Sequence, residues 1–198
     1  MAMNDKNNES LVGYLLISVP NAEEVNSSQS VIYIFAHTAE DGAMGLVLDT
    51  PISEIEAQDF LTQHQIPLPA SGITSYRIGG SEKGYFLLHS SEYHHPLSQK
   101  ITNDTSLIVV NNINTAIKAA SIWQDVTTGS GPQNCLSFVG YTRWGKGQIE
   151  DEIMGNLWLV VPASLHLLFQ VDTQYQWQEA LKSIGIDPNR LSGRSGKA

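Results

Sequence analysis

The segment from Gly140 to Trp158, GYTRWGKGQIEDEIMGNLW, constrains the fold most strongly, because different backbone elements must meet within it. The residues that lead into it, Cys135 to Tyr141, are mostly apolar, β-branched or aromatic, which predicts a buried strand. Gly145 and Gly147 then allow sharp turns and close backbone approach. A short helix over QIEDEIMGN and an apolar run from Leu157 to Val161 complete a strand, turn, helix and return into the core.

The predicted helix has one inner face and one polar face. Ile149 and Ile153 are four residues apart and are expected to point inward together. Gln148 and Glu152 share a second face at the same spacing. The acidic residues fall in the first turns, where the helix dipole favours negative charge, and Gly155 with the following asparagine predicts the helix end.

Two interpretations of this segment stay open at the level of sequence. The functional one is a site at a strand-to-helix turn, with Trp144 beside a glycine loop and Gln148, Glu150 and Glu152 close by. The structural one is a tight junction whose acids match the helix dipole on a solvated face.

Composition narrows the class of protein. The 198-residue chain carries a formal net charge of −9 and a pI of about 5.0, which argues against DNA binding because phosphate contacts need clustered Lys and Arg. Its one cysteine, Cys135, opens an apolar run and is expected to be a buried, inert thiol. The polar start MAMNDKNNES and the absence of a membrane-length apolar run predict a soluble, cytoplasmic protein.

The first half of the chain predicts strands at Leu11–Pro20, Val31–His37 and Gly45–Pro51, the last two as an antiparallel hairpin. Ser53 and a glutamate three residues later form a capping-box pattern at the start of a helix, SEIEAQDFLTQHQ. An inner face of that helix is expected from Ile55, Phe60 and Leu61. The stretch SYRIGGSEKGYFLLHS predicts two more strands, again arranged as a hairpin.

The second half predicts a strand at Ser106–Asn112 and a helix at Asn114–Val126. The inner face of that helix is expected from Ile117, Ala120 or Ser121, and Gln124. PASLHLLF predicts a short helix, and TQYQWQEALKSIGI predicts a longer one with Trp177, Leu181 and Ile184 on one face. Because strands and helices do not alternate strictly, the chain is predicted to be a single α+β domain over residues 11–191, with flexible ends at 1–10 and 192–198.

The central segment resembles the signature of the AlgH/YqgE family of uncharacterised bacterial proteins, GY-x-x-W-x-x-GQLE-x-E-I-x-x-x-x-W. The matching residues are Gly140, Tyr141, Trp144, Gly147, Gln148, Glu150, Glu152, Ile153 and Trp158. Further blocks are similar in order along the chain, from about Leu11 to Leu191. They match at Ser30, His37, Gly42, Ala43, Met44, Gly45 and Pro51, and then at Gly79, Gly80, Gly84 and His89.

The chain departs from the family pattern at four positions. Val25, Ser27 and Gln29 stand where the family usually has Pro, Phe and Arg, and Ser81 stands where it has Pro. Loss of the arginine puts in doubt any anion-binding role at that position.

The resemblance implies a mixed, branched and partly barrel-like β-sheet surrounded by helices. It also implies a binding or regulatory role, since members are described as putative transcriptional regulators. We therefore favour a non-enzymatic module that acts through a protein or a small ligand, with no cofactor and no metal. The alternative is an enzyme that uses Glu150 or Glu152 as general acid or base, in a setting where burial can raise a carboxyl pKa. No G-x-S-x-G motif indicates a hydrolase triad.

The predicted site lies where three glycine-bearing segments, residues 42–45, 79–80 and 145–147, can meet at strand ends. Backbone N–H groups of glycines there can face an anionic or carbonyl group. The alternative is that these are three ordinary turns at separate corners of the sheet. The candidate ligand-binding residues are His37, Gly45, Gly80, His89, Trp144, Gly147, Gln148, Glu150 and Glu152.

Overall fold

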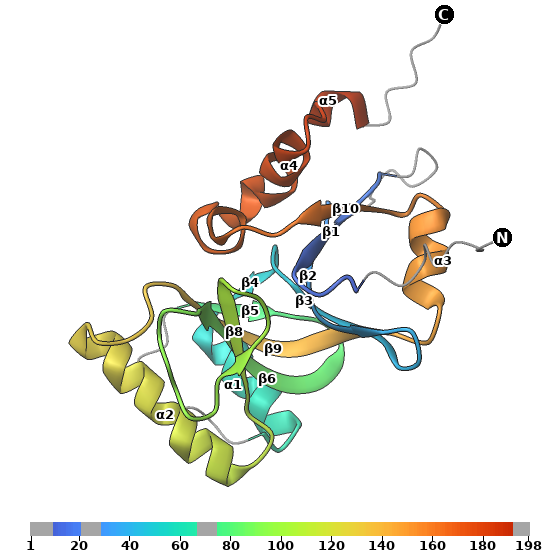
Figure 1. Cartoon of the computed structure of the whole chain (residues 1–198). Helices are drawn as coiled ribbons and strands as arrows, with labels where there is room; N and C mark the ends of the chain where they lie inside the picture. Colours follow the sequence, from blue (N-terminus) through green and yellow to red (C-terminus); the bar gives the residue numbers. More distant parts are fainter. Residues whose placement is uncertain (1–9, 21–28, 67–74, 192–198) are drawn as a thin grey trace, which may run out of the picture.

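A computed structural model describes residues 10–20, 29–66 and 75–191, which fold into one curled sheet with helices around it (Figure 1). The expected flexible ends lie outside the described residues except for Ser10, as do Val25 and Ser27. The strands are β1 (Tyr14–Ser18), β2 (Val31–Thr38), β3 (Gly42–Val47), β4 (Pro51–Ile52), β5 (Tyr76–Ile78), β6 (Glu82–Ser90), β7 (Gln99–Lys100), β8 (Thr105–Val109), β9 (Cys135–Trp144) and β10 (Trp158–Pro162). The helices are α1 (Glu54–Gln63), α2 (Ile113–Thr128), α3 (Gln148–Met154), the π-helix η1 (His166–Gln170), α4 (Thr173–Ser183) and α5 (Pro188–Leu191).

The strand order β10-β1-β2-β3-β9-β6-β8-β7 gives an antiparallel half-barrel that is branched at β9. Strand β9 pairs with β3 along its C-terminal part and with β6 along most of its length, and β5 joins it in parallel. The short strand β4 pairs in turn with β5. The predicted α+β class with a branched, partly barrel-like sheet is therefore confirmed.

Alternating side chains of β9 and β6 divide the core into two layers, because successive residues of a strand point to opposite faces. Phe138 and Phe86 belong to the layer that α4 and η1 cover, with Trp177 and Leu181 of α4 buried against them. Val139 belongs to the layer beneath α1 and α2, on the opposite face of the sheet (Figure 1). Cys135 packs against this second layer, and burial raises the pKa of its thiol to about 12, as expected for an inert cysteine.

A third, smaller core forms where α3 packs on the far end of the sheet. Ile149 is fully buried there and Ile153 packs beside it, so the predicted inner face of the short helix is confirmed. The helix ends at Gly155, and Asn156 follows with a φ of 57°. This third core fixes α3 against β2 and β3, which is the arrangement that positions the candidate site.

The expected hairpin between the two strands of SYRIGGSEKGYFLLHS is wrong. Strand β5 pairs with β4 and β9, whereas β6 pairs with β8 and β9. The connecting Gly79–Gly80 passes so close to β9 that a Cβ on Gly80 would lie 2.2 Å from the carbonyl carbon of Tyr141. The glycine pair therefore lets the chain cross a strand at close range, where a two-residue turn was expected.

Two helix faces also differ from the prediction. Among the α2 side chains that the structure describes, Ala116, Ala119 and Ile122 are buried, and Ile117 is 66% exposed. In α1 the residue Ile55 is 72% exposed, while Ala57 and Leu61 are buried. Small residues can face the core when helices lie close to a sheet, so the stripe of large apolar residues misjudged the orientation of α2. In α1 only Ile55 is misplaced, because the predicted Phe60 and Leu61 do pack inward.

Other local predictions hold. The capping box of α1 is present, with the Ser53 hydroxyl accepting from the backbone of Glu56 and the Glu56 carboxylate accepting in return. Strands β2 and β3 form the expected antiparallel pair, but β3 begins at Gly42, three residues earlier than predicted. No helix within the described residues is long and apolar enough to cross a bilayer.

Candidate functional site

A β-bulge in β2 sets the direction of His37. The pairing with β3 shifts between Ile34 and Ala36, so that Phe35 is the extra residue of the bulged strand. Beyond the bulge His37 lies opposite Ala43, and Ala43 in turn lies opposite Trp144 of β9. His37 therefore sits beside the start of the glycine loop that leads into α3.

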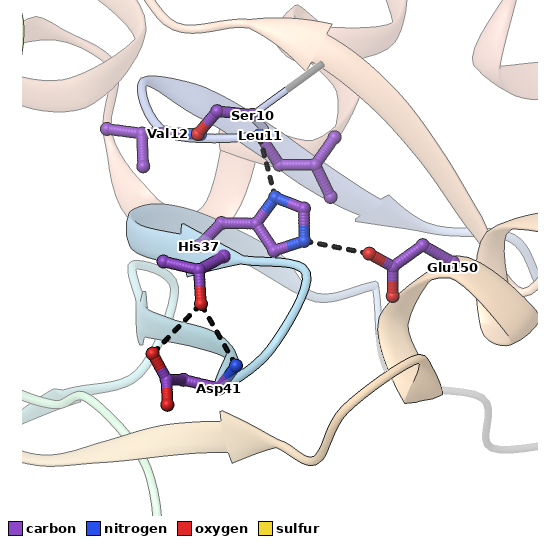
Figure 2. Close-up of polar contacts among 7 residues, drawn as sticks. Ser10, Leu11, Val12, His37, Asp41 and Glu150 are labelled. Atoms are coloured by element: carbon purple, nitrogen blue, oxygen red, sulfur yellow. Dashed lines mark hydrogen bonds and ion pairs between the residues drawn. The ribbon is translucent and has the colours of Figure 1, made fainter. Parts of the chain in front are cut away.

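The His37 imidazole joins three separate parts of the chain, as Figure 2 shows. Its Nδ1 accepts a hydrogen bond from the Leu11 backbone N–H at 3.0 Å, and its Nε2 lies 2.8 Å from Oε1 of Glu150. Because Nδ1 accepts, the proton of a neutral imidazole must be on Nε2, which therefore donates to the carboxylate. The side chain of His37 is only 7% exposed, so the imidazole is largely shielded from water, whereas the Glu150 side chain is 41% exposed.

The second carboxylate oxygen of Glu150 lies in a different environment from the first. Oε2 is buried and has no hydrogen-bond partner among the described residues, although the side chain as a whole is 41% exposed. A buried oxygen without a partner costs free energy, and such exceptions in native proteins call for an explanation.

Glu152 has a different role, because both of its oxygens are occupied. Its Oε2 accepts from the indole Nε1 of Trp144 at 2.9 Å and from that of Trp158 at 2.7 Å. Its Oε1 accepts from the Gln148 side chain at 2.8 Å. The Glu152 carboxylate thus connects the end of β9, the start of α3 and the start of β10. We call the four residues Trp144, Gln148, Glu152 and Trp158 the indole clamp.

The rest of the segment supports the indole clamp. The two indole rings meet edge to face with centroids 6.4 Å apart. The Gln148 side-chain oxygen accepts the N–H of Gly145 at 3.0 Å, which closes the turn before α3. Gly147 caps that helix with a φ of 75°, a conformation that favours glycine. The structural interpretation of the signature thus explains Trp144, Gly147, Gln148 and Glu152.

The glycine segments flank the same strand. Gly45 lies opposite Thr142 in the β3–β9 pair, and Gly80 packs against Tyr141. A Cβ on Gly42 would lie 2.1 Å from the Trp144 carbonyl oxygen, so that glycine also meets β9. At Gly42 and Gly80 the glycines permit close packing of backbone on backbone, whereas a Cβ on Gly45 would lie 2.7 Å from the Ile32 side chain.

His89 lies at the other end of β9 from His37. It pairs with Cys135, the first residue of the strand, whereas the partner of His37 on β3 pairs with Trp144, the last. Along an extended strand the nine intervening steps span roughly 30 Å. His89 is fully buried, with Nδ1 2.9 Å from the Ser90 carbonyl and Nε2 2.8 Å from the Ser98 hydroxyl. The two histidines therefore belong to separate sites.

Sequence reasoning missed the backbone N–H of Leu11, which fixes the His37 tautomer. A main-chain donor from 26 residues away leaves no residue-type signal. It also missed the ion pair between Lys146 and Glu40, at 2.6 Å, which joins the β2–β3 turn to the glycine loop. No group of three or more His, Cys, Asp or Glu side chains suited to a metal ion occurs within the described ranges.

Fold and site together define a class: a single α+β domain with a curled half-barrel, closed at one end by a short helix held through an indole–carboxylate contact. The chain belongs to the AlgH-like family (DUF179), whose pattern it matches over residues 15–189.

Relatives agree with this assignment, and two solved structures agree with the fold. A UPF0301 protein of Rickettsia felis is 34% identical over 99% of this chain and 100% of its own length. One of Rhodospirillum rubrum is 34% identical over 95% and 94%. The solution structure of the AlgH protein from Pseudomonas aeruginosa has a TM-score of 0.67 at 24% identity, with both chains covered completely. A crystal structure of a Corynebacterium diphtheriae protein has a TM-score of 0.61 at 18% identity and shares the fold, covering 100% and 95%.

Proposed function

We propose that this chain is a binding module with a regulatory role, and that the contact between His37 and Glu150 is a non-enzymatic site that recognises a protein or small ligand. The observation that carries the proposal is the buried Oε2 of Glu150, which lacks a partner in the described structure. A ligand that offered an N–H or O–H group to this oxygen would relieve a cost of about 1–3 kcal/mol. The ligand class is therefore a hydrogen-bond donor, cationic or neutral.

The contacts around Glu150 support a binding role more than a catalytic one. Oε1 of Glu150 already accepts from a neutral imidazole, and that imidazole is held on its other side by Leu11. The indole clamp holds α3 against the end of β9 and the start of β10, so the helix keeps the Glu150 carboxylate in a fixed position. The net charge of −9 argues against direct DNA binding, so a regulator of this kind would act through a protein or small ligand.

A second candidate function is general acid–base catalysis by Glu150. The same unpartnered oxygen favours it, because a carboxylate beside a buried imidazole can exchange a proton with a bound substrate. Glu152 supports this alternative less, since three hydrogen bonds engage its two oxygens.

The test is to immobilise the full chain and to compare which proteins and small molecules of a bacterial extract are retained by three forms of it. These are the wild type, Glu150→Gln and the control Asp151→Asn, which removes the same charge from an exposed neighbour. We expect the control to retain ligands like the wild type and Glu150→Gln to lose at least about tenfold in retention, or 1.4 kcal/mol. Equal retention by all three would refute the site. Ligands recovered unchanged favour binding, and their conversion by wild type but not by Glu150→Gln favours the enzyme.

A further inference from the structure

A second polar site lies at the opposite end of β9 from the His37–Glu150 contact. The connection from β6 to β8 encloses a cleft of about 280 Å³, close to the lower limit for small-molecule sites. Ser98 lines this cleft, and its hydroxyl lies 2.8 Å from Nε2 of the buried His89. A serine in contact with a histidine, and open to a cleft on its other side, is the arrangement that nucleophilic catalysis requires.

The hydrogen bonds of His89 determine where its proton lies. A carbonyl oxygen can only accept, so Nδ1 must donate to the Ser90 carbonyl at 2.9 Å. In the neutral imidazole Nε2 is then the acceptor, and the Ser98 hydroxyl donates to it. Burial also lowers the pKa of His89, which favours the neutral form of the ring, the form that a general base must have. The oxygen lone pairs of Ser98 remain directed away from the histidine.

Two of the other side chains that line the cleft add hydrogen-bond donors to it. Lys100 and Asn103 line it, and neither side chain has a hydrogen-bond or ion-pair partner among the described residues. An ammonium and an amide donor beside a serine can stabilise the negative charge that develops on a carbonyl oxygen under attack. The residues that line the cleft include no carboxylate, although the chain as a whole is acidic, so the cleft favours a substrate with a negative charge.

We infer that Ser98 and His89 form a nucleophile–base pair for the hydrolysis of small, negatively charged carboxylic esters. The Ser98 oxygen attacks the ester carbon while its proton passes to Nε2 of His89. The bond to the leaving alcohol then breaks, and His89 returns the proton to the alkoxide. Water then attacks the acyl-serine and gives a proton to His89. The bond between the acyl carbon and the Ser98 oxygen breaks, and that oxygen takes the proton back from His89, which releases the carboxylic acid and restores the serine. No other reactant is needed, and the activity is separate from the proposed binding function.

A fluorophosphonate probe tests the pair directly. Its phosphorus forms a covalent bond with an activated serine oxygen and expels fluoride, with the proton taken up by the base. The full chain is treated with the probe, and the modified residue is found by peptide mass mapping. We expect one adduct on Ser98, none in Ser98→Ala, and labelling at least about 100-fold slower in His89→Gln, because a positioned general base contributes on this scale.

Ser91 provides a matched control, because it lines the same cleft but donates its hydroxyl to the Asn103 carbonyl, which is no base. Ser91→Ala is expected to be labelled like the wild type. A wild-type chain that shows normal circular dichroism but no adduct on Ser98, or labels Ser98 no faster than Ser91, overturns the inference without reference to any variant. A second readout compares 4-nitrophenyl acetate with mono-4-nitrophenyl succinate. The anionic ester is expected to turn over faster, and Lys100→Gln is expected to remove that preference.

Discussion

Replacing Glu152 with alanine tests the indole clamp, because this change leaves both indole N–H groups without their acceptor. Trp144 is only 4% exposed, so water cannot fully replace the lost bond, and an orphaned buried donor costs about 1–3 kcal/mol. Trp158 is partly buried and Gln148 is more open, and each lost bond there adds about 0.5 kcal/mol after water substitutes. The expected total is about 2–4 kcal/mol of the free energy of unfolding.

Urea unfolding measured by tryptophan fluorescence and by far-ultraviolet circular dichroism gives this quantity. For a chain of this size the same loss lowers Tm by about 4–16 °C. Asp151→Ala is the control, since this exposed acid contributes only through the helix dipole and its loss costs below about 1 kcal/mol. Glu152→Gln keeps one acceptor oxygen and is expected to fall between the two. If Glu152→Ala costs no more than Asp151→Ala, the carboxylate does not hold the tryptophans and the explanation of the signature is wrong.

Three further predictions concern strain, pH and charge. Gly42→Ala is expected to lower the free energy of unfolding by about 3 kcal/mol or more in chemical denaturation, because the new Cβ meets the Trp144 carbonyl. Gly129→Ala, at the same φ of 79° but in open space, is expected to lower it by only about 1–2 kcal/mol. Equal losses would contradict the close approach at Gly42. The free energy of unfolding is expected to fall as pH drops below about 6.5. Burial lowers the pKa of His89 in the folded state, so in this range the unfolded chain binds a proton at His89 that the folded chain does not. The same fall in a titration of His89→Gln would refute this. The net charge of −9 predicts weak, non-specific DNA binding at most, and sub-micromolar, sequence-selective binding at physiological salt in a fluorescence anisotropy assay would overturn it.

Local chemistry made several features predictable from the sequence. The capping box at Ser53 predicts the start of α1, because its donors and acceptors lie within three residues. The spacing of Ile149 and Ile153 predicts the inner face of α3, and the four-residue spacing of Gln148 and Glu152 places them in hydrogen-bond range on one face. The mixture of strands and helices without strict alternation predicts the α+β class.

Contacts between distant segments were decided by the tertiary structure alone. His37 meets Glu150 across 113 residues, whereas Glu152, two residues further and about 200° around the helix, meets the two indoles instead. Strand β9 separates β5 from β6, because a parallel partner from far along the chain competes with the local hairpin.

The sequence by itself therefore determined the elements whose stabilising partners lie within a few residues, together with the family and the class of fold. Only the tertiary structure decided which carboxylate holds the tryptophans, which one keeps an oxygen without a partner, and which serine lies against His89. The physical reason is that the pattern of residue types records periodicity and local hydrogen bonding, whereas the meeting of side chains depends on strand register and on the bulge at Phe35.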